Sequence, residues 1–512
     1  MVPLRLVFLW HYHQPDYRWE GTALLPWVRL RAAKDYARLF ELFGMLPEFR
    51  CVLNLVPSLL LQLVGYATGQ LTDTAEEFCR RAAAEPSEEE RRYWQMIAPP
   101  EPLRQRSAAA RDLWQRLAAG TVLPEQWQDV RMWTQLLWMS PHRERFPILQ
   151  SWFERGSGYS VEEIRLLLML QRLLAEEALQ KLRQLLSTER VELSCSPFYH
   201  PILPLLCNTD SMRESDPLLP RPEPPFRFPA DAWLQCLRAR QFCWELLGVV
   251  PEGMWPSEGA VSMEAVQQMA AAGVRWAATD EALLFASLPQ APWWQKYFPH
   301  RIRTAAGELV ILFRDRELSD ALSFHYGGWA PERAVEDFCG RLQGIREGLL
   351  RSVGEDGLRD AVVLLALDGE NCWDTYPDEG TPFLRLLAER LQTEEWVTTT
   401  TCRALCGGRF PELPWIRAGS WVGGSLRIWI GTAENNAAWR ALAELRMRLE
   451  RARSALPPER WRDALEQLLC AEGSDWFWWR SPERPTAAAP LFERLFQLRL
   501  EAARSVLGEA WR

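Results

Sequence analysis

The sequence predicts an α/β fold in which a TIM-like barrel, with seven candidate strands for a (β/α)7 arrangement, carries a helical insertion and a helical C-terminal region. Three observations predict it. Short apolar runs alternate with stretches of helical periodicity, as in parallel βα units. Several runs are hydrophobic throughout, which is typical of strands buried on both faces. Polar or aromatic residues follow each run, and functional residues of such barrels lie at the C-terminal strand ends.

The strands are predicted first, because they define the barrel. Seven runs cover residues 4–10, 51–56, 190–196, 253–257, 274–280, 309–315 and 361–368. The run 395–400 is a candidate eighth strand, so these patterns alone leave the strand count open. Helices are predicted between the strands, for example over 232–248, 262–273 and 334–350.

Two longer regions have helical periodicity without strands. Residues 69–187 are rich in Ala, Glu, Arg and Leu and read as an insertion between the second and third strands. The chain is helical again after about residue 432. We therefore predict a catalytic barrel over 1–400, insertion included, and a mainly helical C-terminal domain over 401–512 that contributes to the cleft.

Composition and charge narrow the class of protein. The net charge of -8, from 59 basic and 67 acidic residues, argues against a nucleic-acid binder. The 27 tryptophans raise the probability of a carbohydrate cleft, because indole faces stack on sugar rings. The 11 cysteines include no C-x-x-C pair and suggest reduced thiols in a cytoplasmic protein. No signal peptide and no membrane-spanning run is expected.

Two histidines follow the first apolar run, in the segment LWHYHQP. His11 and His13 are two residues apart and therefore point the same way in an extended strand, inward over the barrel. Zinc sites use such H-x-H pairs, and His200, Asp280 or Glu258 could supply a third ligand. Hydrogen bonding in a polar pocket wall is the favoured alternative, because the chain has no H-E-x-x-H motif and no cysteine ligand spacing.

Two carboxylates stand at strand ends. Glu258, in GMWPSEGAVS, follows Trp255 at a predicted strand-to-helix turn, where a helix N-terminus would stabilise its anion; it could also merely serve the helix start. Asp368 ends a very apolar strand, which is costly unless the side chain faces a cleft or has a partner. Such a pair can perform glycoside hydrolysis, although carboxylate pairs also bind magnesium or form salt bridges.

Aromatic and charged segments could complete a cleft. The segment SDWFWW places Asp475 beside three tryptophans, and a glycine-rich loop carries Trp421. Both could be core packing or sugar subsites. Arg314 and Asp320 could support the substrate or form an ordinary surface ion pair.

Five segments in this order resemble glycoside hydrolase family 57, a family of α-glucan-active enzymes. They are HYHQP (11–15), ELSCSPFYHPILP (192–204), GMWPSEGAVS (253–262), LDGENCW (367–373) and AEGSDWFWW (471–479). The forms MWPSE and SDWFWW look most similar to the amylopullulanase and α-amylase branch. Arg480 and Ser481 depart from the Tyr-Gly that often follows there.

The resemblance implies an incomplete seven-stranded barrel and a retaining mechanism without a metal or other cofactor. Glu258 matches the family's nucleophile and Asp368 its general acid/base. We expect burial and like charge to keep Asp368 protonated while Glu258 is ionised. The predicted substrate-binding residues are His11, His13, His200, Trp255, Asp280, Arg314, Asp320, Trp373, Trp421, Asp475, Trp476, Trp478 and Trp479, and of the first two we favour His13 as the substrate contact.

The expected activity is hydrolysis of α-1,4 and perhaps α-1,6 linkages in an α-glucan. A 4-α-glucanotransferase or a branching enzyme with the same pair is the close alternative. Alternatives from other classes are a zinc-dependent deacetylase or mannosidase, which metal analysis would identify, and a non-catalytic glucan-binding protein, which Glu258→Gln would leave unchanged. Nucleic acid and membrane partners are not expected, and the oligomeric state is left open.

Overall fold

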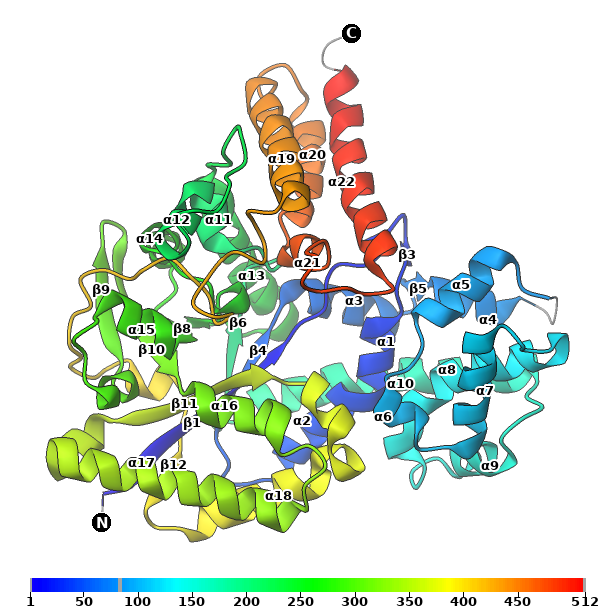
Figure 1. Cartoon of the computed structure of the whole chain (residues 1–512), viewed down its shortest axis with the longest axis horizontal. Helices are drawn as coiled ribbons and strands as arrows, with labels where there is room; N and C mark the ends of the chain where they lie inside the picture. The colour runs from blue at the N-terminus through cyan, green and yellow to red at the C-terminus, as the bar shows by residue number, and fades with distance from the viewer. Residues whose placement is uncertain (1, 82–84, 510–512) are drawn as a thin grey trace.

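Seven parallel strands close into a barrel, so the predicted fold class is confirmed (Figure 1). The computed structural model describes residues 2–81 and 85–509. The barrel strands, in chain order, are β1 (Leu4–Tyr12), β4 (Cys51–Leu55), β6 (Val191–Cys195), β7 (Gly253–Met254), β8 (Trp276–Asp280), β10 (Gly307–Arg314) and β11 (Val362–Asp368). Their spatial order is the same, because each pairs with the next and β11 pairs with β1.

The barrel is unevenly closed. β1 and β11 are paired over seven positions, from Arg5↔Val362 to His11↔Asp368. β10 and β11 share the single register pair Arg314↔Leu364, beside which the Asp315 amide donates to the Leu364 carbonyl at 2.8 Å. The seam between these two strands therefore has the fewest register pairs in the barrel wall.

The candidate eighth strand does not enter the barrel circuit. β12 (Val397–Thr399) pairs with the start of β1, and β4 pairs with its later half. One edge of β1 is paired with β11. Both β12 and β4 therefore pair with the opposite edge of β1, β12 at its start and β4 further along. The remaining strand of this nine-stranded sheet, β9 (His300–Thr304), is antiparallel to β10.

Successive side chains of each strand point alternately into the barrel and away from it. A separate buried cluster contains Val7 and Leu9 of β1, and Leu364 and Ala366 of β11. The next inward position on each strand is His11 or Asp368. The inward-facing positions are therefore apolar inside the barrel and polar at its C-terminal rim.

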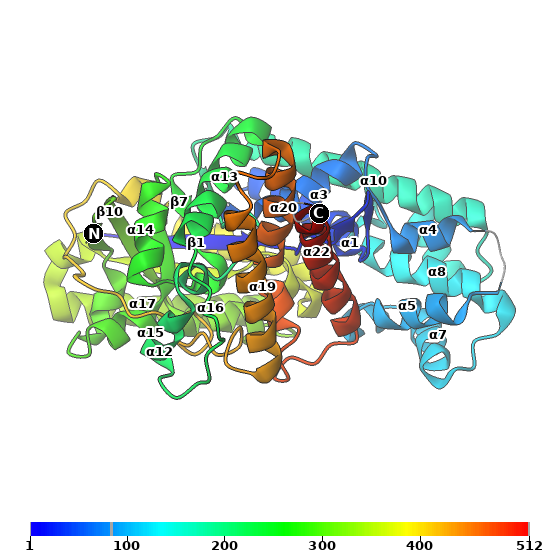
Figure 2. The same cartoon turned by 90° about the horizontal axis from the view of Figure 1, so that it is seen from above.

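Helices cover the barrel and extend from it (Figures 1 and 2). Larger helices around the barrel are α2 (Ala37–Gly44), α3 (Pro57–Ala67), α13 (Pro229–Leu247), α14 (Met263–Ala271), α17 (Pro331–Asp360) and α18 (Thr381–Thr393). The segment between β4 and β6 forms α4 (Thr74–Arg80), α5 (Glu88–Met96), α6 (Glu101–Arg104), α7 (Ala108–Ala119), α8 (Trp127–Leu136), α9 (Pro147–Arg155) and α10 (Val161–Leu186). Within the described residues, no helix is both long and apolar enough to cross a bilayer.

The last part of the chain packs beside the open end of the barrel. It forms α19 (Ala433–Arg451), α20 (Pro458–Ala471), α21 (Ser474–Trp478) and α22 (Ala489–Glu509). The short α21 is tied to the loop after β6, because Pro201 and Gly473 form a β-bridge and the Ser474 amide donates to the His200 carbonyl at 3.0 Å. This contact brings the C-terminal segment to the polar rim.

Candidate active site

A cavity of about 560 Å³ lies where the polar rim meets the C-terminal segment. Its wall combines carboxylates, histidines, arginines and aromatic rings from both parts of the chain. Ten of the residues predicted for the site line it: His11, His13, Glu258, Arg314, Asp320, Asp368, Trp421, Asp475, Trp478 and Trp479. Residues more than 450 positions apart in sequence thus share one wall.

Glu258 is held in a tight turn after the short strand β7. Its backbone is left-handed, with φ 58° and ψ 25°, a conformation that is uncommon for a residue with a side chain. Its carbonyl accepts a hydrogen bond from the Trp421 amide at 3.0 Å. The Trp421 indole Nε1 also donates to Glu258 Oε2 at 2.8 Å. The glycine-rich loop therefore fixes both the backbone and the carboxylate of Glu258.

The expected helix N-terminus at Glu258 is absent, and this prediction is wrong. Helix α14 begins five positions later, at Met263, with the Ser262 hydroxyl as its cap. The pKa of Glu258 is instead raised to about 7, because burial, together with the nearby Asp368 and Asp475, raises it by more than the Trp421 hydrogen bond and His13 lower it. Glu258 therefore changes charge near neutral pH rather than being held as an anion by a helix.

Asp368 ends β11 opposite His11 in the strand register. Both belong to the inward-facing rows of their strands and both line the cavity. His11 Nδ1 lies 2.7 Å from Asn54 Oδ1, and burial lowers the pKa of His11 to about 3. His11 is consequently a neutral neighbour of Asp368.

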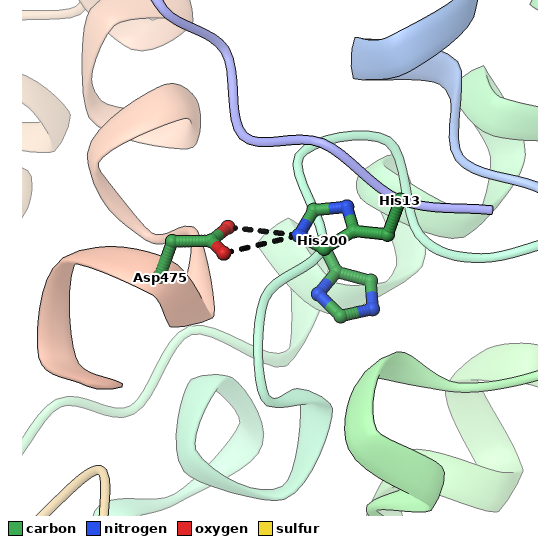
Figure 3. A group of neighbouring side chains, drawn as sticks. All are labelled: His13, His200 and Asp475. Atoms are coloured by element: carbon green, nitrogen blue, oxygen red, sulfur yellow. Dashed lines mark hydrogen bonds and ion pairs between the residues drawn. The ribbon is translucent and has the colours of Figure 1, made fainter. Parts of the chain in front are cut away.

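His13, His200 and Asp475 form a group at the junction with the C-terminal segment (Figure 3). The two Asp475 oxygens lie 3.0 and 3.1 Å from His13 Nε2. Burial lowers the pKa of His13, but Asp475, Glu258 and Glu370 raise it more, so the net pKa is raised. Burial and the two other histidines lower the pKa of His200 well below its usual value. The pKa shifts thus favour the protonated form of His13 and the neutral form of the His200 ring that stacks on it.

This group is also the place to test for a metal, since its possible ligand atoms lie within 4.8 Å of one another. The His13 and His200 rings are stacked, with centroids 3.8 Å apart and planes 22° apart. An imidazole nitrogen binds a metal in the plane of its ring, at about 2.1 Å for zinc. Two rings that share an ion must therefore diverge from it, and stacked rings do not. The described geometry fits an ion pair and a ring stack, not a zinc site.

Arg314 connects the barrel seam to the loop that holds Glu258. Its guanidinium donates to Asp280 at 3.0 Å and to Asp320 at 2.6 Å, and it lies 5.0 Å from the centre of the Trp421 ring. Arg314 is buried, so these are not ordinary surface ion pairs. The arginine supports the tryptophan that in turn donates to Glu258.

Five predicted substrate-binding residues lie outside the cavity wall. Trp373 is fully buried against Trp10 and donates to the Gly369 carbonyl, and Trp476 is buried and donates to the Cys470 carbonyl. Trp255 fills the top of the barrel interior beneath the site. His200 and Asp280 are buried and contact His13 and Arg314, respectively. The structure thus places these five in support of the wall rather than in it.

Other residues of the wall were not predicted. They are Arg316, Ser323, Phe324, Glu370, Val422, Gly423, Ser474 and Arg484. Glu370 is the notable one, because burial raises its pKa to about 7 and Gln14 donates to it at 2.6 Å. Its position two residues after Asp368 was the available signal.

The sequence of the chain matches one protein family over most of its length. Residues 7–413 match the model of glycosyl hydrolase family 57. Among curated protein sequences, no significant match was found.

Solved structures share the whole fold at low identity. A branching enzyme of this family from Pyrococcus horikoshii is 16% identical, with a TM-score of 0.62 over 99% of this chain and 94% of the other. The α-amylase AmyC from Thermotoga maritima is 14% identical, with a TM-score of 0.62 over 99% and 93%. A 4-α-glucanotransferase from Thermococcus litoralis is 14% identical, with a TM-score of 0.55 over 98% of this chain and 60% of the other. These likenesses establish a common fold.

Proposed function

This chain belongs to glycosyl hydrolase family 57, and from that premise we propose that it cleaves α-glucans with Glu258 as nucleophile and Asp368 as general acid/base. One observation carries the proposal: both carboxylates line the same cavity at the C-terminal rim of the barrel. Enzymes named as branching enzyme, α-amylase and 4-α-glucanotransferase share the fold, which supports an α-glucan as substrate. The 11 cysteines are all free thiols, which supports a reducing compartment, the cytoplasm.

The proposed reaction is a retaining double displacement. An ionised Glu258 oxygen attacks the anomeric carbon while Asp368 gives its proton to the departing glycosidic oxygen, so the C–O bond to the leaving sugar breaks as the bond to Glu258 forms. Asp368, now ionised, takes a proton from the incoming water or sugar hydroxyl, whose oxygen displaces Glu258. The free carboxylate and the acid of the resting enzyme are thereby restored.

Two contacts of Glu258 favour the charged form that a nucleophile needs, against the burial that raises its pKa. The Trp421 indole donates to one carboxylate oxygen, and His13, whose pKa Asp475 raises, also lowers the pKa of Glu258. Water and a sugar hydroxyl compete for the same intermediate. Hydrolysis of α-1,4 linkages, with α-1,6 as a second specificity, is our first assignment, and glucan transfer or branching is the alternative with the same pair.

Product analysis tests this assignment. The purified protein is incubated with amylose, pullulan and maltooligosaccharides. Net new reducing ends show hydrolysis, redistributed chain lengths without them show transfer, and new branch points show branching. No turnover of any of these substrates would contradict the proposed function.

Trp421→Phe is expected to shift the pH dependence of kcat/KM towards higher pH. The indole hydrogen bond lowers the pKa of Glu258, so its loss raises that pKa above about 7, and a higher pH is then needed to ionise the nucleophile. The pH profile of the free enzyme reports this group. Phenylalanine keeps the ring but not the N–H donor. A loss of activity that is equal at every pH would show that Trp421 acts by packing alone.

A further inference from the structure

Phe324 is a large apolar side chain that the cavity wall leaves open to solvent. Twelve large hydrophobic side chains of the described residues are exposed, and Phe324 is the one among them that lines this cavity. Its exposed fraction is 77%. Single exposed apolar residues are ordinary on a protein surface. Phe324 differs from the other exposed apolar residues because its ring lies in the wall of the proposed catalytic cavity, where a ligand can contact it.

The turn that carries Phe324 is anchored on both sides. Phe324 lies in a π-helical turn, Ala321–His325, which directly follows α16 (Arg316–Asp320). Leu322 is fully buried, and its carbonyl accepts the Tyr376 hydroxyl at 2.6 Å. Tyr326, on the other side, donates to Asp337 at 2.7 Å. Because the flanks are held, the exposure of the ring is built into the fold, and π-turns are frequent at functional sites.

Polar groups of the same segment lie in the wall with the ring. Arg316, Asp320 and Ser323 all line the cavity. About a third of the Asp320 side chain is exposed, although one oxygen accepts from Arg314. An aromatic face can stack on the C–H face of a sugar ring, while carboxylate, hydroxyl and guanidinium groups bind its hydroxyls. The segment therefore supplies both the aromatic face and the polar groups that a sugar-binding site needs.

We propose that Phe324 is the base of a further sugar-binding subsite in the cavity wall, for a glucosyl unit that is not at the scissile bond. This rests on the proposed function, since the ligand is the same α-glucan. Chains long enough to reach Phe324 gain binding that shorter ones lack, so this residue sets the chain-length preference.

The test compares chain lengths in matched variants. For the wild type, Phe324→Ala and Phe324→Trp, kcat/KM is measured on maltotriose and on maltoheptaose. The ratio of the long to the short substrate is expected to fall about three- to tenfold in Phe324→Ala, the scale of one aromatic contact, and to be retained in Phe324→Trp. The control is Trp244→Ala, because Trp244 on α13 is also exposed but lies outside the cavity wall; it should leave the ratio unchanged.

An unchanged ratio in Phe324→Ala would overturn the subsite, whether or not overall activity falls. A second measurement does not depend on turnover. Maltoheptaose is titrated calorimetrically into Glu258→Gln and into Glu258→Gln/Phe324→Ala, and weaker binding by the double variant is expected. Equal binding would overturn the subsite. A wild type that cleaves no α-glucan would overturn the proposed function, and the titration would still decide on Phe324.

Discussion

Glu258→Gln is expected to lower turnover of maltooligosaccharides by about 10³-fold or more, because the amide that replaces the carboxylate cannot form the glycosyl-enzyme. Glutamine keeps the size of the side chain, and its carbonyl can still accept the Trp421 indole hydrogen bond that positions Glu258. Initial rates of reducing-end release, with calorimetric titration of maltoheptaose, are the measurements. Turnover should be lost while glucan binding remains.

The matched control is Glu264→Gln, the same change at an exposed position in the first turn of α14. It should leave the rate unchanged. Full activity of Glu258→Gln would remove Glu258 from the role of nucleophile and return the non-catalytic glucan-binding alternative to consideration. Loss of binding together with turnover would point to a disturbed cavity wall instead.

Asp368→Asn is expected to lower kcat/KM on maltooligosaccharides by about 10²- to 10⁴-fold, the usual contribution of general acid/base catalysis. The reason is that the sugar leaving group then departs without a proton. A maltosyl fluoride needs no protonation to lose fluoride, so its first step should be impaired far less. Fluoride release should therefore show a burst followed by a slow phase, because the second step still lacks its base. Stopped-flow or quenched measurement of fluoride gives both phases.

Asp378→Asn is the control for this variant. Asp378 is exposed on the loop that follows Asp368, and asparagine tolerates its left-handed φ of 45°. The control should retain the activity of the wild type. If Asp368→Asn loses equal activity on the fluoride and on maltooligosaccharides, leaving-group protonation is not its function.

The strand pattern predicted the barrel because its seven apolar runs correspond to seven real strands. Alternation along the first strand predicted that His11 points inward, and the charge at the end of an apolar strand drew attention to Asp368; both line the cavity. The eighth candidate, 395–400, forms a strand as well. The hydropathy pattern does not predict which strand a given strand pairs with. The structure shows that β12 pairs with the start of β1.

The local errors have physical causes. A proline and a glycine around Glu258 signalled a turn, but not the left-handed backbone that delays the helix to Met263. Aromatic composition says nothing about which face of a helix is buried, so Trp476 was assigned to the cleft together with Trp478 and Trp479, which do line it. Phe324 was missed because exposure of an apolar ring is a property of the folded turn, not of the sequence around it.

The ion pair between His13 and Asp475 has a consequence for synthesis of the protein on the ribosome. His13 is synthesised long before its carboxylate partner Asp475, which lies 462 positions later, on α21. A nascent chain that has already closed its barrel therefore still has an incomplete glucan cavity. Docking of α21 on the loop after β6 completes it, so the cavity wall is finished only after synthesis has passed α21.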